Sequence, residues 1–170
     1  MPGDFQARNA ALAALAVKQV LPEIDEVTIE KGLEKAALPG RFEIDGNIIF
    51  DGAHTVKSIG YTMDTLEKIF EGEGPANLHL LFGCAADKEV EKMAECFKGR
   101  FSMVTVTKPG SVKESDLERM KKAFDMAGIE YFSCGDHLKA IPYALEKARE
   151  ENARLLVTGS FYLVSEVKKY

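Results

Sequence analysis

The chain has 170 residues, 46% of them hydrophobic and 29% charged, which is typical of one folded domain with its own core and excludes a disordered chain. Its net charge of −5 comes from interspersed acidic and basic residues, which argues against nucleic acid or an anionic membrane as the main partner. No apolar run is long enough to span a bilayer, and the amino terminus lacks the basic-then-apolar order of a signal peptide.

The first forty residues predict two helices. Residues 5–22 are rich in Ala and Leu and predict a helix that stops near the proline at its end. Residues 28–40 predict a second, shorter helix with Thr28 as its N-cap and Pro39-Gly40 at its end. Because these helices stand outside the alternating pattern that follows, we expect residues 1–38 to be a linker or an arm packed on the next domain.

Helical and extended apolar patterns alternate through the rest of the chain. Several of the extended runs are continuous, which is typical of strands covered on both faces. Because alternating strands and helices favour right-handed crossovers, we predict an α/β fold, a three-layer Rossmann-like sandwich with a mainly parallel sheet after the helical linker. The helical segments begin at Val56, Val90, Leu117 and Leu138, and the extended runs are NIIF, NLHLLFG, RFSMVTVT, EYFS and RLLVTGS.

Three polar clusters follow predicted strands, where ligands bind in open parallel sheets. They are DGAHT at 51–55, GCAADK at 83–88 and TGSF at 158–161. If the strand order brings them together, one rim carries a carboxylate, an imidazole, an ammonium, a hydroxyl and several helix N-termini. Such a rim suits an anion or a nucleotide.

Each candidate residue also has a structural explanation. Asp51, Asp87 and Ser160 are each placed to cap a helix, and His54 in a first helical turn is typical of a partly buried imidazole. Lys88 then is an ordinary solvated side chain. The corresponding explanations for the remaining candidates are a surface ion pair for Arg41 and an outward-facing amide for Asn9.

Motifs for several other chemistries are absent from the sequence. There is no GxGxxG after a strand, no GxxxxGK[ST] phosphate loop, no GxSxG elbow, no HExxH and no Cys/His set with metal spacing, so we expect no metal site. Cys84, Cys96 and Cys134 form no CxxC pair and predict a reduced, cytoplasmic setting. Composition and spacing therefore predict an α/β domain with a polar rim and do not name a reaction.

Several stretches together resemble one enzyme family. LPGRFE followed by IIFDGAHT resembles the PGR…hhhDgAHNP signature that opens the C-terminal domain of folylpolyglutamate synthases, in the Mur ligase superfamily. DFQARNAALAALAV, TIEKGLEKAALPGR, LLFGCAADKEVEKM and LLVTGSFYLVSEV resemble further motifs of these enzymes in the same order, from Phe5 to Val167. Thr55-Val56 stands where the family has Asn-Pro, and because threonine is a good N-cap the turn is expected to survive.

The resemblance implies an ATP-dependent amide ligase, in which a folate carboxylate is phosphorylated and the amine of L-glutamate attacks the acyl phosphate. It implies that residues 1–38 join to an N-terminal ATPase domain with the phosphate loop and the Mg²⁺ ligands, and that 39–170 form the C-terminal ligase domain. No such domain precedes Met1. We therefore expect an excised domain, rather than a separate gene product that complements another chain, and we expect it to be inactive alone.

For the nucleotide, the resemblance implies three contacts. Asn9 matches a linker asparagine that reaches the adenine, Arg41 an arginine that meets the ATP phosphates, and Asp51 an aspartate that contacts the ribose. A guanidinium fits phosphates with a bidentate geometry that lysine lacks, and a carboxylate accepts the hydrogens of ribose hydroxyls.

For the reaction and the acceptor, the resemblance implies three further residues. His54 matches a histidine near the reacting phosphoryl group and is the catalytic candidate. Lys88 and Ser160 match positions where related ligases hold the carboxylates of the incoming amino acid. Binding both substrates in one cleft supplies proximity, the main contribution to such a step.

Other functions remain open at this point. A Mur-type ligase that adds an amino acid to a peptidoglycan precursor belongs to the same superfamily, although the GSFYLVSEV ending favours folate. A non-catalytic module would use the same rim to bind a nucleotide or an anion, and a structural domain would use it only for packing.

Overall fold

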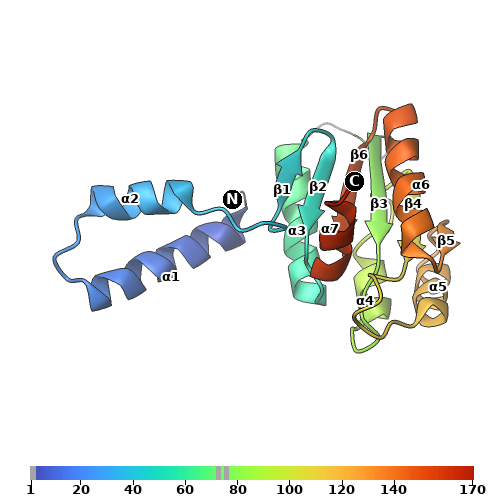
Figure 1. Cartoon of the computed structure of the whole chain (residues 1–170), viewed down its shortest axis with the longest axis horizontal. Coiled ribbons are helices and arrows are strands. Elements are labelled where there is room, and N and C mark those ends of the chain that lie inside the picture. Colours follow the sequence, from blue (N-terminus) through green and yellow to red (C-terminus); the bar gives the residue numbers. More distant parts are fainter. Residues whose placement is uncertain (1–2, 72–73, 75–76) are drawn as a thin grey trace.

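The computed structural model describes residues 3–71, 74 and 77–170 as a helical arm followed by an α/β body (Figure 1). The arm consists of α1 (Asp4–Val20) and α2 (Glu26–Lys35), and it holds no buried side chain within the described residues. It projects away from the sheet instead of packing on it (Figure 1). Its contact with the body is at the base of α1, where the Phe5 ring stacks on Tyr61.

Two details of α2 differ from the prediction. Asp25 is the N-cap, because its carboxylate accepts a hydrogen bond from the Thr28 N–H at 2.7 Å, and Thr28 lies inside the helix. The helix ends at Lys35, before Pro39-Gly40, because the backbone at Ala36 is already extended. An isolated ten-residue helix without buried contacts has little to hold its last turn.

The sheet of the body is six-stranded, in the order β1-β2-β6-β3-β4-β5, and all neighbouring pairs are parallel except β1-β2. The predicted mainly parallel sheet is thus confirmed. The strands are β1 (Glu43–Asp45), β2 (Ile48–Asp51), β3 (Leu78–Phe82), β4 (Met103–Thr107), β5 (Phe132–Cys134) and β6 (Arg154–Thr158).

The sequence reading missed β1. It pairs with β2 through the two-residue turn Gly46-Asn47, with Asp45 opposite Ile48. Gly46 has a φ of 56°, a conformation that glycine adopts without strain. A glycine-asparagine pair between two short apolar runs is a hairpin signal that could have been used.

Helices cover both faces of the sheet, which confirms the three-layer sandwich (Figure 1). Alternate strand residues face opposite layers, so Ile49 packs in one core cluster and Phe50 in the other. The first layer contains α3 (Val56–Ile69), α4 (Val90–Glu95) and α5 (Leu117–Met126), and the second contains α6 (His137–Glu150) and α7 (Phe161–Val167).

The turn after β2 keeps its helix start despite the Thr55-Val56 departure. Thr55 is the N-cap of α3: its hydroxyl accepts a hydrogen bond from the Ser58 N–H at 3.2 Å, and the Ser58 hydroxyl accepts from the Thr55 N–H at 3.0 Å. This reciprocal capping box satisfies two backbone donors at the helix start. The expectation that threonine preserves the turn is confirmed.

Candidate functional site

The three polar clusters meet because β6 lies between β2 and β3. Asp51, the last residue of β2, pairs with Thr158, the last residue of β6, and Thr158 pairs with Phe82, the last residue of β3. The carboxyl ends of these strands are therefore level, and the loops that follow begin side by side. Two cavities lie among these loops, described below as the Asp51 cavity and the Lys88 cavity.

Asp51 does not cap α3, contrary to its structural explanation. Its Oδ2 atom accepts a hydrogen bond from the Thr62 hydroxyl at 2.7 Å, and its Oδ1 atom accepts from the Ala53 N–H at 3.1 Å. The residue is only 9% exposed, and this burial raises the pKa of the carboxyl. The two hydrogen bonds, and then the charges of Arg41 and His54, oppose the rise in pKa.

Replacing Asp51 with Asn is expected to stabilise the fold at neutral pH. The amide keeps both contacts if its oxygen accepts from the Ala53 N–H and its nitrogen donates to Thr62, whose single hydroxyl hydrogen then turns from residue 51 to the Ser58 carbonyl. Because the pKa of Asp51 is raised in the folded state, protonation favours folding, and this contribution is lost as pH rises through that pKa. The gain in urea midpoint should thus be present at pH 7 and absent at pH 3. An equal gain at both pH values would contradict this account.

The residues on both sides of Arg41 have unusual backbone conformations. Gly40, before it, has a φ of 71°, and Phe42, after it, has a φ of 45° although it is a bulky residue in the core. The Gly40 carbonyl accepts a hydrogen bond from the Gly52 N–H at 2.8 Å, which ties this turn to the end of β2. The Arg41 guanidinium then lies 4.6 Å from the centre of the Phe161 ring.

His54 lies in the loop between β2 and α3 and lines the Lys88 cavity. Its Nδ1 atom is 2.8 Å from the Gly52 carbonyl oxygen, which can only accept, so Nδ1 carries the hydrogen. Nε2 has no hydrogen-bond partner within the described residues and is the ring nitrogen available for chemistry. The ring meets the edge of Phe161 at 6.1 Å between centroids. Gly52 is required here, because a Cβ would fall on the Phe161 ring.

The Lys88 cavity has a volume of about 210 Å³ and is lined by His54, Lys88 and Ser160 together with Lys113. Lys88 donates to the Asp87 carboxylate at 2.9 Å, so Asp87 pairs with the ammonium and does not cap α4, where Glu89 is the N-cap. Ser160 is the N-cap of α7, and its hydroxyl accepts from the Tyr162 N–H at 3.1 Å. Two ammonium groups at one cavity suit a ligand with two anionic groups.

The Asp51 cavity is smaller, about 40 Å³, and Arg41 and Asp51 line it. The arm closes one side of it, because the Phe5 ring stacks on Tyr61 at 4.9 Å between centroids. Asn9 does not line either cavity. It is exposed one turn further along α1, where its amide is 3.4 Å from the Gln6 side chain. The structure thus brings all the predicted site residues to these cavities except Asn9.

Sequence reasoning missed one residue of these cavities, Lys113, and gave another, Phe161 of the TGSF cluster, no role. Lys113 comes from the Pro- and Gly-containing loop after β4, the strand next to β3. The rule that led to the other clusters, polar residues beyond the carboxyl end of a strand, could have found it. Phe161 contacts both Arg41 and His54, and nothing in its spacing distinguishes it from a core aromatic residue.

The site shows no arrangement for a metal ion. Within residues 3–71, 74 and 77–170, no group of three or more His, Cys, Asp or Glu side chains could hold one. The residues present therefore do not fit a Mg²⁺ site.

In the same ranges, no helix has the length and apolar character needed to cross a membrane. Burial raises the pKa of the Cys84 thiol to about 12, so this cysteine behaves as a core residue.

Comparison with known proteins gives consistent relatives. The chain is 32% identical over 98% of its length to a probable bifunctional folylpolyglutamate synthase/dihydropteroate synthase of Haloferax volcanii. It is 28% identical, also over 98%, to a UDP-N-acetylmuramoyl-L-alanyl-D-glutamate–2,6-diaminopimelate ligase of Corynebacterium efficiens. A Mycobacterium tuberculosis folylpolyglutamate synthase, solved with ADP and AMPPCP, has the same fold, with a TM-score of 0.86 at 22% identity over 99% of the chain.

The chain spans only part of each of these proteins, namely 20% of the Haloferax protein, 34% of the Corynebacterium ligase and 40% of the Mycobacterium chain. In the last, it corresponds to the C-terminal domain. Residues 40–161, well over half of the sequence, match the family described as Mur ligase, glutamate ligase domain. This chain belongs to the Mur ligase family and carries its glutamate ligase domain.

Proposed function

We propose that this chain is the acceptor-binding part of a cytoplasmic, ATP-dependent amide ligase that adds L-glutamate to a folate. The observation that carries the proposal is the pair of neighbouring cavities at level strand ends. One is lined by Arg41 and Asp51, the other by two lysines, and Phe161 connects them through its contacts with Arg41 and His54. Residues 39–170 then form the ligase domain, and 1–38 link it to an ATPase domain of the same polypeptide.

The reaction proceeds in two steps. The folate carboxylate attacks the terminal phosphorus of ATP, which releases ADP and leaves an acyl phosphate. The glutamate amine, after losing a proton, attacks the acyl carbon, and inorganic phosphate leaves as the amide forms. Mg²⁺ would supply charge neutralisation on the triphosphate, and its ligands belong to the ATPase domain because the residues described here do not build a site for it.

Asp51 and Arg41 contact parts of a nucleotide that lies against the Asp51 cavity, since the cavity volume of about 40 Å³ is too small to enclose one. Asp51 uses two of its roughly four acceptor positions for Thr62 and Ala53, so the others remain for ribose hydroxyls. Arg41 places a guanidinium on the phosphates, where it offsets charge that develops during transfer. Asn9, exposed one turn beyond Phe5 on α1, contacts the adenine from the arm.

In the Lys88 cavity, Lys88, Lys113 and the α7 start at Ser160 bind the two carboxylates of glutamate. The Nε2 atom of His54, which has no hydrogen-bond partner among the described residues, lies near the reacting phosphoryl group. A diaminopimelate acceptor would bring an additional ammonium, which needs a free carboxylate. Of the charged side chains that line this cavity, two are ammonium groups and one, Asp87, is a carboxylate, a balance that favours an acceptor with two carboxylates and a single amine.

The proposal is tested in the complete protein encoded by the gene, after an immunoblot of source cells shows whether its mass exceeds 18.7 kDa. We expect ATP-dependent incorporation of glutamate into folate, and no product with a muramyl substrate and diaminopimelate. Lys88→Met should raise the KM for glutamate at least about tenfold, the effect of one charge-assisted hydrogen bond, and change the KM for ATP less than about twofold. The matched control is Lys92→Met, which removes a solvent-exposed lysine paired with Glu89.

Three outcomes would contradict the proposal. An unchanged KM for glutamate in Lys88→Met would exclude the acceptor role. Turnover with diaminopimelate in place of glutamate would favour the peptidoglycan ligase. Nucleotide binding without any product would favour a binding module, and unchanged nucleotide affinity in Arg41→Ala and Asp51→Ala, measured by calorimetry, would exclude the assigned nucleotide contacts.

A further inference from the structure

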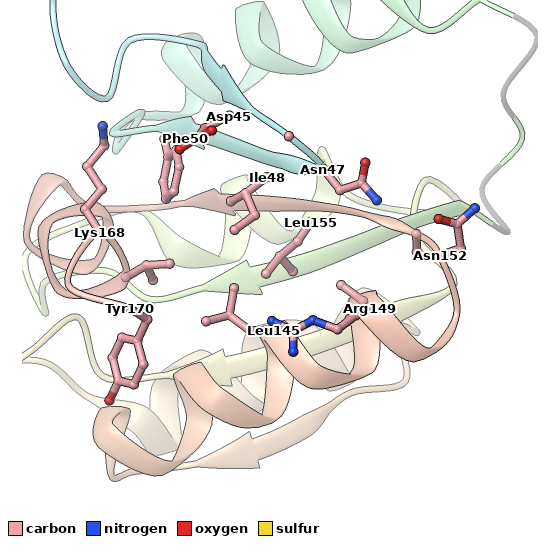
Figure 2. A pocket seen from close by; sticks show the side chains of 14 residues that line it. Asp45, Asn47, Ile48, Phe50, Leu145, Arg149, Asn152, Leu155, Lys168 and Tyr170 are labelled. Atoms are coloured by element: carbon pink, nitrogen blue, oxygen red, sulfur yellow. The ribbon is translucent and has the colours of Figure 1, made fainter.

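A separate cavity of about 750 Å³ lies on the face of the sheet that α6 and α7 cover (Figure 2). It is named here the Arg149 cavity. Its volume is in the range of sites for small organic ligands, roughly 300–1,000 Å³. None of the residues that line the Asp51 or Lys88 cavity lines this one. Its apolar lining comes from two strands and two helices, through Ile48, Phe50, Leu145, Leu155 and Val167.

Three polar side chains at this cavity have no hydrogen-bond or ion-pair partner among the described residues. They are Arg149 near the end of α6, Asn152 in the turn that follows, and Asn47 in the β1-β2 turn. Figure 2 shows Arg149 extended along the apolar lining with its guanidinium directed toward Leu145, away from the Asn47 and Asn152 amides. Asn152 is held at a φ of 50°, a conformation that is costly for most residues other than glycine and that asparagine tolerates. All three residues are solvent-exposed, and the Arg149 guanidinium lies along the apolar lining, where it can donate to a ligand in the cavity.

The other cation of the cavity is already engaged. Lys168 donates to the Glu43 carboxylate at 2.6 Å and lies 4.9 Å from the centre of the Phe50 ring. Asp45, the carboxylate among the lining residues, stands on the hairpin side (Figure 2). An anionic ligand is therefore attracted by Arg149 and repelled by Asp45, so the cavity has a positive side at Arg149 and a negative side at Asp45.

We propose that the Arg149 cavity binds a planar aromatic carboxylate, independently of the two cavities at the strand ends. The rings lie on the apolar lining, which includes the Phe50 ring and, at the far end, Tyr170. The carboxylate pairs with the Arg149 guanidinium through two parallel hydrogen bonds. The geometry favours a carboxylate because the planar guanidinium fork matches its two oxygens.

The experiment titrates the chain with 2-naphthoate and with 2-naphthamide, which has the same rings without the charge. Calorimetry should give saturable binding of naphthoate, and naphthamide should bind at least about tenfold more weakly. In backbone amide NMR spectra, the shifts that move should map to β2, β6 and the end of α6. Arg149→Gln should weaken naphthoate about tenfold and leave naphthamide within about twofold of its original affinity.

Two further variants separate recognition from folding. Lys147→Gln removes a cation of the same helix that is paired with Glu150 and does not line the cavity, so naphthoate affinity should not change. Leu145→Trp fills the cavity and should abolish the binding of both probes while the unfolding midpoint is retained. This variant decides the question if Arg149→Gln fails to fold.

Several results would overturn the proposal. These are equal naphthoate binding by Arg149→Gln, no saturable binding at millimolar probe, and shifts confined to the loops around Asp51 and Lys88. Closure of the cavity by a second copy of the chain, seen as a dimer whose formation excludes naphthoate, would also overturn it. None of these measurements depends on ligase turnover, so the proposal can fail while the proposed function stands.

Discussion

Replacing Arg41 with alanine in the complete protein is expected to lower kcat for glutamate addition by about two to three orders of magnitude, the usual effect of losing one preorganised group that stabilises transition-state charge. The reason is geometric. Gly40 and Phe42 flank the residue with left-handed backbone conformations, and the Phe161 ring lies 4.6 Å from the guanidinium. A charge that is fixed in advance needs no reorganisation when the phosphoryl group moves.

Arg41→Lys separates this role from simple charge. Lysine keeps the positive charge but loses the bidentate fork, so it should recover only a small part of the rate. Arg100→Ala is the matched control, because Arg100 pairs with Glu67 and precedes β4. It therefore lies at the amino ends of the parallel strands, opposite the carboxyl ends that carry the site. Single-turnover measurement of ADP formation distinguishes the phosphoryl-transfer step from glutamate attack. Full activity of Arg41→Ala would remove Arg41 from the mechanism.

Gly159→Ala is expected to lower the free energy of unfolding of the chain by about 3 kcal/mol or more. Gly159 has a φ of 99°, and an added Cβ would lie 2.7 Å from the Gly83 carbonyl oxygen and 2.7 Å from the Phe82 ring. An unfavourable backbone conformation costs about 1–3 kcal/mol, and forced overpacking costs a similar amount. Because the Gly159 N–H also donates to the Ala53 carbonyl at 2.9 Å, the change also disturbs the loop that carries His54.

Gly60→Ala is the control for Gly159→Ala. Gly60 lies within α3, and a Cβ there meets no atom within 4 Å. Alanine in a helix interior is better than glycine by roughly 0.5–1 kcal/mol, so this variant should be slightly more stable than the original chain. Urea unfolding followed by circular dichroism measures both variants. A loss below about 1 kcal/mol for Gly159→Ala would mean that the loops relax around the new methyl group.

The sequence predicted the parts of the fold that depend on local pattern. Apolar periodicity placed each parallel strand and the helices between them, because a strand buried on both faces and an amphipathic helix have different repeats. It failed where local signals compete. Asp25 and Thr28 are both good N-cap residues, and the end of α2 depends on the absence of buried contacts, which no local pattern records.

The site could be predicted only in pieces. Sequence reasoning placed Asp51, His54, Lys88 and Ser160 after strands, but their meeting depends on β6 lying between β2 and β3. That strand order arises from pairing between segments more than seventy residues apart in the chain, such as Leu78 with Arg154. A different pairing, His79 with Met103, places β4 beside β3 and so lets its loop contribute Lys113.

The projecting arm has a mechanical consequence. α1 has 17 residues, which corresponds to a length of roughly 25 Å at about 1.5 Å per residue. A tilt of about 15° at its base, where Phe5 stacks on Tyr61, would swing the far tip by roughly 6 Å while the root moves very little. A small rotation beside Asp51, such as one that separates the stacked Phe5 and Tyr61 rings, would therefore displace the far end of the arm by about the pitch of one helical turn.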